Sequence, residues 1–308
     1  MIDAYASQPH YWHHIAPIWQ QLTDDERGTV YLHPSVLSDT PHTKAAQPPP
    51  SRRPILIAAA PDLSKTGDRP VVFVEHGAGQ TYNTPHPSYA GGPDRDKVRL
   101  FLCPNDRVRD ANARAYPVPA EVVGSPRLEW LAGLEGTGEH LAVTWHWNCD
   151  LVPETRSAFP RYRKALPELA GALGHAHPRI WGACQPAYKQ AGIYPIQEWA
   201  DVLREGIGCL VADNTSVMWE AAALNIPVAV VNLNTYRRDV EHGLRFWEYA
   251  NVGPHINHPS ELGEVAKSWR EWAGVYDRRR REVAGLLYGN IPGSAWRAAE
   301  AIRSHGMT

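Results

Sequence analysis

Short apolar runs alternate along the chain with stretches whose apolar residues have helical spacing. The apolar runs predict buried strands at residues 2–6, 29–33, 55–60, 71–74, 98–103, 141–145, 179–184, 209–212 and 228–231. The helical patterns fall at residues 15–22, 106–115, 157–173, 196–205, 218–224, 261–287 and 294–304. Because strands that alternate with helices form parallel sheets covered on both faces, we predict an α/β fold with two doubly wound parallel sheets. Ligands of such sheets bind at the carboxyl ends of the strands.

The most informative stretch is residues 211–227, which read V-A-D-N-T-S-V-M-W-E-A-A-A-L-N-I-P. A short apolar run is followed by Asn214, Thr215 and Ser216, which are all residues that favour the start of a helix. Free amide groups and the helix dipole at such a start attract phosphate. Glu220 lies one turn after Ser216 on the same helix face, where a carboxylate can accept hydrogen bonds from ribose hydroxyls. The alternative is an ordinary capped helix with a solvated Glu220.

A second motif follows the predicted strand at residues 71–74, where the sequence continues as E-H-G-A-G-Q-T-Y. Gly77 and Gly79 allow a tight turn and a close approach of the backbone to a ligand. His76 can take a proton from an acceptor hydroxyl at neutral pH. Strand geometry directs Glu75 to the opposite face, so His76 is the expected catalytic base. A turn with a hydrogen-bonded histidine is the alternative.

The stretch D-N-T-S-V-M-W-E-A-A-A-L-N-I-P-V resembles the D-Y-S-S-x-x-x-D-x-x-x-L-x-x-P-V signature of CDP-glycerol glycerophosphotransferases. It is also similar to the equivalent strand, loop and helix of GT-B glycosyltransferases and of UDP-N-acetylglucosamine 2-epimerases. The resemblance implies that Asp213, Thr215 and Ser216 hold a diphosphate and that Glu220 holds the ribose. The glycerophosphotransferases usually have Asp where this chain has Glu220, which favours the glycosyltransferase variant.

Two further segments carry the same resemblance. The segment at 76–82 resembles the H-G-x-x-x-K motif of the glycerophosphotransferases, in which the histidine is catalytic. This chain departs from that motif, because Gln80, Thr81 and Tyr82 stand where the lysine is expected. The segment V-V-G-S-P-R-L-E-x-L, which begins at Val122, resembles the motif that closes the N-terminal domain of this superfamily.

By the same resemblance, we expect a GT-B-like arrangement in which the two domains face a cleft. The glycine-rich stretch at 133–139 is the expected linker. The predicted parts are an acceptor-side domain at 1–135, a nucleotide-donor domain at 140–290 and a final helix at 291–308 that crosses back to the first domain.

Other candidates lie in loops that the pattern places at strand ends. The resemblance brings His10 and His13 to the cleft, on the acceptor side with Gly77, Gly79 and Gln80; a solvated helix start is the alternative for the histidines. On the donor side we expect His146, Gln185 and Arg237, which follow predicted strands. Arginine in such a loop suits a phosphate or a carboxylated sugar, although a solvated basic loop fits Arg237 equally well.

The composition removes several classes of function. The net charge of −2 provides no global basic field for nucleic acid or an anionic membrane. The four cysteines contain no C-x-x-C pair, and no pair of carboxylates suggests a metal site. We therefore expect metal-independent chemistry. We also expect no cofactor, with a nucleotide-diphosphate sugar as the co-substrate. The first residues lack a signal-peptide pattern and no apolar run reaches membrane-spanning length, so a cytoplasmic protein is expected.

These patterns together predict a glycosyltransferase that moves a sugar from a nucleotide-diphosphate donor to an acceptor hydroxyl. The alternatives are a CDP-glycerol-type glycerophosphotransferase, a sugar-nucleotide epimerase, and a non-catalytic module that binds a nucleotide or a glycan. No motif specifies the oligomeric state, and none distinguishes a glycan, a protein and a modified nucleic-acid base as the acceptor.

Overall fold

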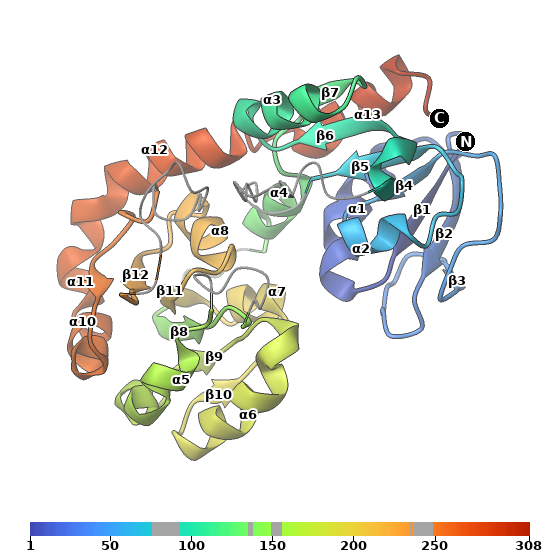
Figure 1. Cartoon of the computed structure of the whole chain (residues 1–308). Helices are drawn as coiled ribbons and strands as arrows, with labels where there is room; N and C mark the ends of the chain where they lie inside the picture. Colours follow the sequence, from blue (N-terminus) through green and yellow to red (C-terminus); the bar gives the residue numbers. More distant parts are fainter. Residues whose placement is uncertain (76–92, 135–137, 149–155, 235, 237–248) are drawn as a thin grey trace. The chain divides into compact units, whose positions relative to one another are not determined.

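The computed structural model describes residues 1–75, 93–134, 138–148, 156–234, 236 and 249–308 (Figure 1). The chain divides into two compact units, and each is described by itself. Unit 1 comprises Met1–Trp130 and Leu286–Thr308, and unit 2 comprises Leu131–Gly285. No helix in the described ranges combines the length and the apolar character needed to cross a membrane.

Unit 1 is built on a parallel sheet that contains seven strands among the described residues, in the order β3-β2-β1-β4-β5-β6-β7 (Figure 1). These strands are β1 (Ile2–Ala6), β2 (Arg27–Leu32), β3 (Thr43–Lys44), β4 (Ile55–Ile57), β5 (Val71–Val74), β6 (Val98–Cys103) and β7 (Ala120–Val122). The helices are α1 (Pro9–Gln21), α2 (Ala60–Leu63), α3 (Asp106–Ala115), α4 (Pro126–Ala132) and α13 (Ser294–Ser304), with the 3-10 helix η2 (Pro93–Lys97).

Unit 2 contains a second parallel sheet, with six described strands in the order β10-β9-β8-β11-β12-β13. These strands are β8 (His140–Thr144), β9 (Leu173–Gly174), β10 (Tyr194–Pro195), β11 (Ile207–Ala212), β12 (Val228–Val231) and β13 (His255–Ile256). Its α-helices are α5 (Phe159–Tyr162), α6 (Trp181–Gln190), α7 (Trp199–Arg204), α8 (Val217–Ala223), α10 (Leu262–Lys267), α11 (Trp269–Trp272) and α12 (Asp277–Tyr288, which continues into unit 1). Its 3-10 helices are η4 (Arg163–Leu169), η5 (Pro178–Ile180), η6 (Pro259–Glu261) and η7 (Ala273–Tyr276).

Alternation along the buried strands explains why helices cover both faces of the first sheet. In β5, Val72 and Val74 join one apolar cluster, whereas Val71 and Phe73 join another. Successive side chains of a strand point to opposite faces, so a strand that is apolar throughout must be covered twice. The predicted α/β fold with two doubly wound parallel sheets is therefore confirmed.

The segment that begins at Val122 has a structural role in unit 1. Gly124 has a φ of +84°, and a side chain there would collide with the Ser294 hydroxyl. Glu129 of α4 accepts hydrogen bonds from the amides of Gly293 and Ala295, at 2.5 and 2.8 Å. These amides belong to the start of α13, which packs against α1. The motif thus joins the end of the chain to the first domain of the sequence.

Three predicted elements are wrong. Residues 179–184 form the end of η5 and the start of α6 rather than a strand. The strand of this region is β9, which has only two residues, and η5 begins after it at Pro178. The helix predicted at 157–173 is divided into α5 and η4, which contains Pro167. The long helix predicted at 261–287 is a series of short segments that ends in α12.

Candidate functional site

The carboxyl edge of the unit 2 sheet is organised around Asp213, which directly follows β11. Its Oδ1 accepts a hydrogen bond from the His146 amide at 2.7 Å. Its Oδ2 accepts from the Ala158 amide at 3.0 Å and from the Ser157 hydroxyl at 3.3 Å. One buried carboxyl group therefore fixes the loop after β8 and the start of α5 against the end of β11.

Burial dominates the electrostatics of Asp213. Removal from water raises its pKa to about 7, although the hydrogen bonds from Ala158, His146 and Ser157 act in the opposite direction. The side chain has no exposed surface. Asp213 is thus an internal brace of the loop rather than a group that contacts a ligand.

The loop after Asp213 leads into α8 with polar groups at its start. Ser216 is the N-cap residue, yet its side chain makes no capping hydrogen bond, and it is partly exposed. Asn214 is 1% exposed, and within the described residues its Oδ1 has no hydrogen-bond partner. Thr215 is buried beside it. Hydroxyl and amide groups that are not used by the fold therefore gather at this strand end.

The helix α8 places Glu220 one turn after Ser216, as predicted from the sequence. Glu220 is 5% exposed, so it lies in the wall of this edge rather than in open solvent. The predicted helix stop is also confirmed, because Asn225 has a φ of 57°, a left-handed conformation that ends helices.

Flat side chains from the loops after β8 and β9 lie next to this loop. The His146 and Trp147 rings each lie 5.9 Å from the His177 ring, between ring centroids. The Arg179 guanidinium stacks 4.1 Å from the centre of the Trp147 ring. Trp147 and His177 are half-buried, so they offer edges and faces to a ligand.

Of these residues, only His146 was a candidate on sequence grounds. His177 and Arg179 were missed because the strand that precedes them, β9, has two residues and leaves no apolar run to read. The signal that could have indicated them is a second histidine, His177, which follows the strand next to the one that precedes His146. Behind this surface, the Thr144 hydroxyl lies 2.7 Å from Nδ1 of the buried His175.

Gln185 is placed differently from the prediction. It lies inside α6 rather than at a strand end, because the strand predicted before it does not exist. It is partly exposed on that helix. The prediction that Gln185 contacts the donor was based on a position at a strand end, and the structure does not place it there.

In unit 1, His10 and His13 lie in the first turns of α1, which follows β1. The His13 ring stacks on Trp130 with 4.8 Å between centroids, and the His10 ring lies 4.1 Å from that of Tyr11. Both histidines are half-buried, so they are not simply the solvated start of a helix. His76, Gly77, Gly79, Gln80 and Arg237 lie outside the described residues.

Glu75, the residue before His76, is held in the interior. Its Oε1 accepts hydrogen bonds from Nη1 of Arg95 and Nδ2 of Asn112, each at 3.0 Å. The Arg95 guanidinium also lies 4.6 Å from the centre of the Phe73 ring, on one face of the sheet. Glu75 is therefore committed to a buried ion pair, as expected of a residue that is not the base.

A carboxylate that sequence reasoning missed lies at the carboxyl edge of the same sheet. Asp62 of α2 is 1% exposed, and its Oδ2 accepts a hydrogen bond from the Ser7 amide at 3.1 Å. Burial raises its pKa to about 6, while Oδ1 has no hydrogen-bond partner among the described residues. Nothing in the local sequence, A-P-D-L, distinguishes this aspartate from a surface one.

The described residues contain no group of three or more His, Cys, Asp or Glu side chains that is arranged to hold a metal ion. The expectation of metal-independent chemistry remains a prediction.

Comparisons with known proteins relate the chain to enzymes of one fold. No protein-family model matches the sequence, and no curated protein matches it. Among solved structures, the wall teichoic acid polymerase TagF has a TM-score of 0.68 at 12% identity, covering 99% of this chain and 88% of TagF. A putative UDP-N-acetylglucosamine 2-epimerase from Listeria monocytogenes has a TM-score of 0.65 at 14% identity, covering 99% of this chain and 96% of the epimerase.

A third structure, UDP-GlcNAc 2-epimerase from Neisseria meningitidis bound to UDP-GlcNAc, has a TM-score of 0.58 at 12% identity and covers 98% of this chain and 99% of the epimerase. At these identities the likeness shows the fold alone. The chain has a GT-B-like fold, and the resemblance to glycerophosphotransferases and epimerases is confirmed at that level.

Proposed function

We propose that the protein is a glycosyltransferase that moves a sugar from a nucleotide-diphosphate donor to an acceptor hydroxyl. The observation that carries the proposal is the edge of unit 2 at which Asp213 braces the loops after β8 and β11. There, the Ser216 hydroxyl lies at the start of α8 and makes no capping hydrogen bond, while the uncommitted Asn214 Oδ1 beside it can accept a hydrogen bond from a ligand hydroxyl. Hydroxyl and backbone amide donors at one strand end are the arrangement that an anionic diphosphate requires.

Each part of the donor has a candidate partner in unit 2. We assign the diphosphate to Ser216, Thr215 and the neighbouring His146, and the ribose hydroxyls to Glu220. The half-buried ring of Trp147 provides a flat surface for a base. Arg237 stays a proposed phosphate contact on the strength of its sequence position.

In the proposed reaction, the imidazole of His76 accepts the proton of the acceptor hydroxyl. The acceptor oxygen forms a bond to the anomeric carbon of the sugar, and the bond between that carbon and the diphosphate breaks. The nucleoside diphosphate leaves with the bonding electrons, and hydrogen bonds from the loop after β11 stabilise its additional charge. The choice of His76 is supported by the neighbouring Glu75, because its carboxylate is already paired with Arg95 in the interior.

A CDP-glycerol-type glycerophosphotransferase is the second candidate. The TM-score of 0.68 with TagF supports it, as does the D-N-T-S sequence after β11. The sequence Q-T-Y at 80–82, in place of the lysine of that family, argues against it. Turnover of CDP-glycerol but not of any nucleotide sugar would favour this candidate.

A binding screen followed by a turnover assay tests the proposal. UDP-, CDP-, GDP- and dTDP-linked donors are screened for an increase in melting temperature, which a ligand specific to the native state must cause. Donors that bind are then incubated with glycan, protein and nucleic-acid acceptors, and release of the nucleoside diphosphate is measured. We expect one nucleotide class to bind and to turn over. Binding without turnover across all acceptors would support a non-catalytic module instead.

A further inference from the structure

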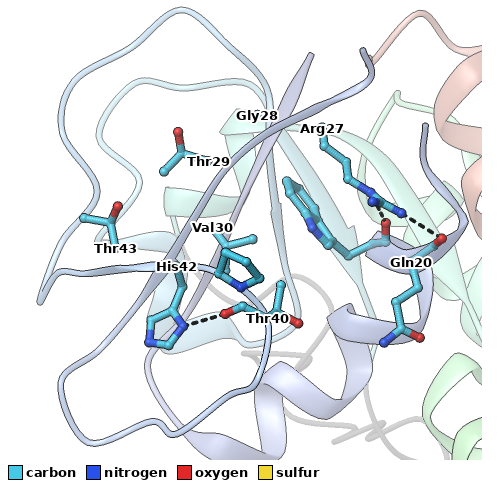
Figure 2. A pocket seen from close by; sticks show the side chains of 10 residues that line it. Gln20, Arg27, Gly28, Thr29, Val30, Thr40, His42 and Thr43 are labelled. Atoms are coloured by element: carbon cyan, nitrogen blue, oxygen red, sulfur yellow. Dashed lines mark hydrogen bonds between the residues drawn. The ribbon is translucent and has the colours of Figure 1, made fainter. Parts of the chain in front are cut away.

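A hollow of about 600 Å³ lies in unit 1, at the amino-terminal half of β2 (Figure 2). It exists because β3 pairs only with Tyr31 and Leu32, so the earlier residues of β2 have no strand beside them on that side. The end of α1 and the loop before β3 provide the other walls. The lining residues are Trp19, Gln20, Arg27, Gly28, Thr29, Val30, Thr40, Pro41, His42 and Thr43.

The single guanidinium of this lining is largely occupied by the fold. Arg27 donates from Nε to the Trp19 carbonyl and from Nη2 to the Gln20 carbonyl, both at 2.9 Å (Figure 2). Its Nη1 donates to Asp24 at 3.2 Å. No Asp or Glu is among the lining residues. The hollow is therefore rigid at this wall and carries little net charge.

The rest of the lining offers both donors and acceptors. The hydroxyls of Thr29, Thr40 and Thr43 make no hydrogen bond within the described part of the chain. Nδ1 of His42 lies 2.7 Å from the Thr40 carbonyl oxygen (Figure 2). Since a carbonyl only accepts, this nitrogen carries the hydrogen, and Nε2 of the neutral ring is an acceptor. The hollow thus combines free hydroxyls with an oriented acceptor.

Apolar surface lies among these polar groups. Pro41 and Val30 line the same hollow, as does Trp19, which is 5% exposed. A ligand that matches it must have hydroxyls that both donate and accept, alternating with C–H surface, and no charge. Sugar rings have this chemistry. We propose that the hollow is a binding site for a neutral oligosaccharide.

The hollow extends along β2 toward the carboxyl edge of the same sheet. Its far end is at Arg27, about 17 Å from Leu32 at about 3.3 Å per residue, whereas Thr43 pairs with Tyr31, next to that edge. A single sugar unit cannot span this length, whereas an extended glycan can. If the proposed transferase activity is correct, this site implies that the acceptor is a glycan. The role as an acceptor site rests on the proposed function, whereas the binding of an oligosaccharide to the hollow does not.

The first test is direct binding without a donor. The ¹⁵N-labelled full chain is titrated with maltotriose, cellotriose and tri-N-acetylchitotriose, and amide shifts are followed by NMR. We expect one of these probes to shift the amides of Thr29, His42 and Thr43 in a saturable manner. No shift of these amides by any probe at about 10 mM, where an affinity near 1 mM would be nearly saturating, would overturn the proposal.

Matched variants then test the assigned groups. Thr43→Val and Thr29→Val keep the shape and remove a hydroxyl, so each should weaken trisaccharide binding about 2- to 12-fold. Thr43→Ser and Thr29→Ser retain the hydroxyl and should bind nearly as the parent does. His42→Asn keeps a donor near the Nδ1 position and removes the Nε2 acceptor, so it should weaken binding, whereas His42→Gln should weaken it less. Equal binding by the Val and Ser variants would contradict the assignment.

A competition experiment separates this site from the donor site. UDP and CDP should not displace the trisaccharide, and Ser216→Ala should not change its affinity. Displacement by a nucleotide would show that the sugar occupies the donor site and would overturn the separate site. If no nucleotide binds at all while the trisaccharide still shifts Thr43, the transferase proposal fails and the saccharide site stands.

Discussion

At the residue scale, the proposed donor site depends on side chains at the start of α8. Asp213 has the most distinctive environment, but all of its hydrogen bonds are internal. Ser216 and Glu220, on the adjoining helix, are the groups through which a donor would be held. The sequence predicted Ser216 and Glu220 as a pair, because a spacing of four residues places two side chains on one helix face.

The first prediction concerns that pair. Ser216→Ala and Glu220→Ala should each weaken the binding of the preferred nucleoside diphosphate by about 1.5–3 kcal/mol, since each removes a hydrogen bond that involves a charged group. Calorimetric titration measures the change, and thermal unfolding serves as the control for folding. Unchanged affinity in both variants would move the donor site elsewhere.

The second prediction concerns the pH dependence of stability. The folded state raises the pKa of Asp213 to about 7 from 3.8, so folding favours its protonated form. Its contribution to the free energy of unfolding is therefore fully present below pH about 4 and is lost as the pH rises to about 7. Asp62 acts in the same direction, but only up to about pH 6.

Asp213→Asn does not titrate, so the decline in stability between pH 6 and 7 should become shallower than in the parent. The variant should also be less stable at pH 8, because an amide group replaces an oxygen that accepts two hydrogen bonds. Urea unfolding at several pH values provides the comparison. The same slope in both proteins would show that Asp213 is ionised throughout this range.

At the element scale, the sequence predicted the strands that contain an apolar run and missed the two-residue strands. β5 and β12 are four-residue apolar runs and were read directly. β9 and β10 have two residues each, and their pairing is determined by the neighbouring strands rather than by their own composition. A similar limit applies to Asp213, whose partner Ser157 is 56 residues away in the sequence.

The third prediction concerns the join between α4 and α13. Glu129 accepts hydrogen bonds from two amides at the start of α13. The first amides of a helix have no hydrogen-bond partner within the helix itself. Glu129→Ala should lower the free energy of unfolding by about 1.5–3 kcal/mol and leave nucleotide affinity unchanged. Glu121→Ala, which removes an exposed partner of His305, is a control that should cost little. Equal stability of the two variants would contradict the role given to Glu129.

At the scale of the whole molecule, the sequence predicted two parallel sheets, and the structure confirms them. The alternation of apolar runs with helical patterns carried that prediction, because it persists even where single elements were misread. The cleft that the resemblance implies between the two domains, and the domain limits at 135 and 140, remain predictions. The identity of the acceptor could not be predicted, since no motif specifies it.

The fourth prediction concerns metal ions. Turnover should persist in excess EDTA, because the proposed donor site stabilises the diphosphate with hydrogen bonds from the loop after β11 and α8. Activity that is abolished by EDTA and restored by magnesium or manganese would contradict this site. The comparison requires only the parent protein and its preferred donor.

In the proposed reaction, unit 2 holds the donor while a base from unit 1 acts on the acceptor, and the His76→Ala variant tests this division of roles. Turnover and nucleoside diphosphate affinity are measured on the same preparation. We expect kcat to fall by roughly 10²–10⁴-fold, the usual contribution of a general base, while the affinity for the nucleoside diphosphate stays the same. Near-normal turnover would make His10 or His13 the better candidate, and loss of donor binding together with turnover would contradict the division of roles between the two units.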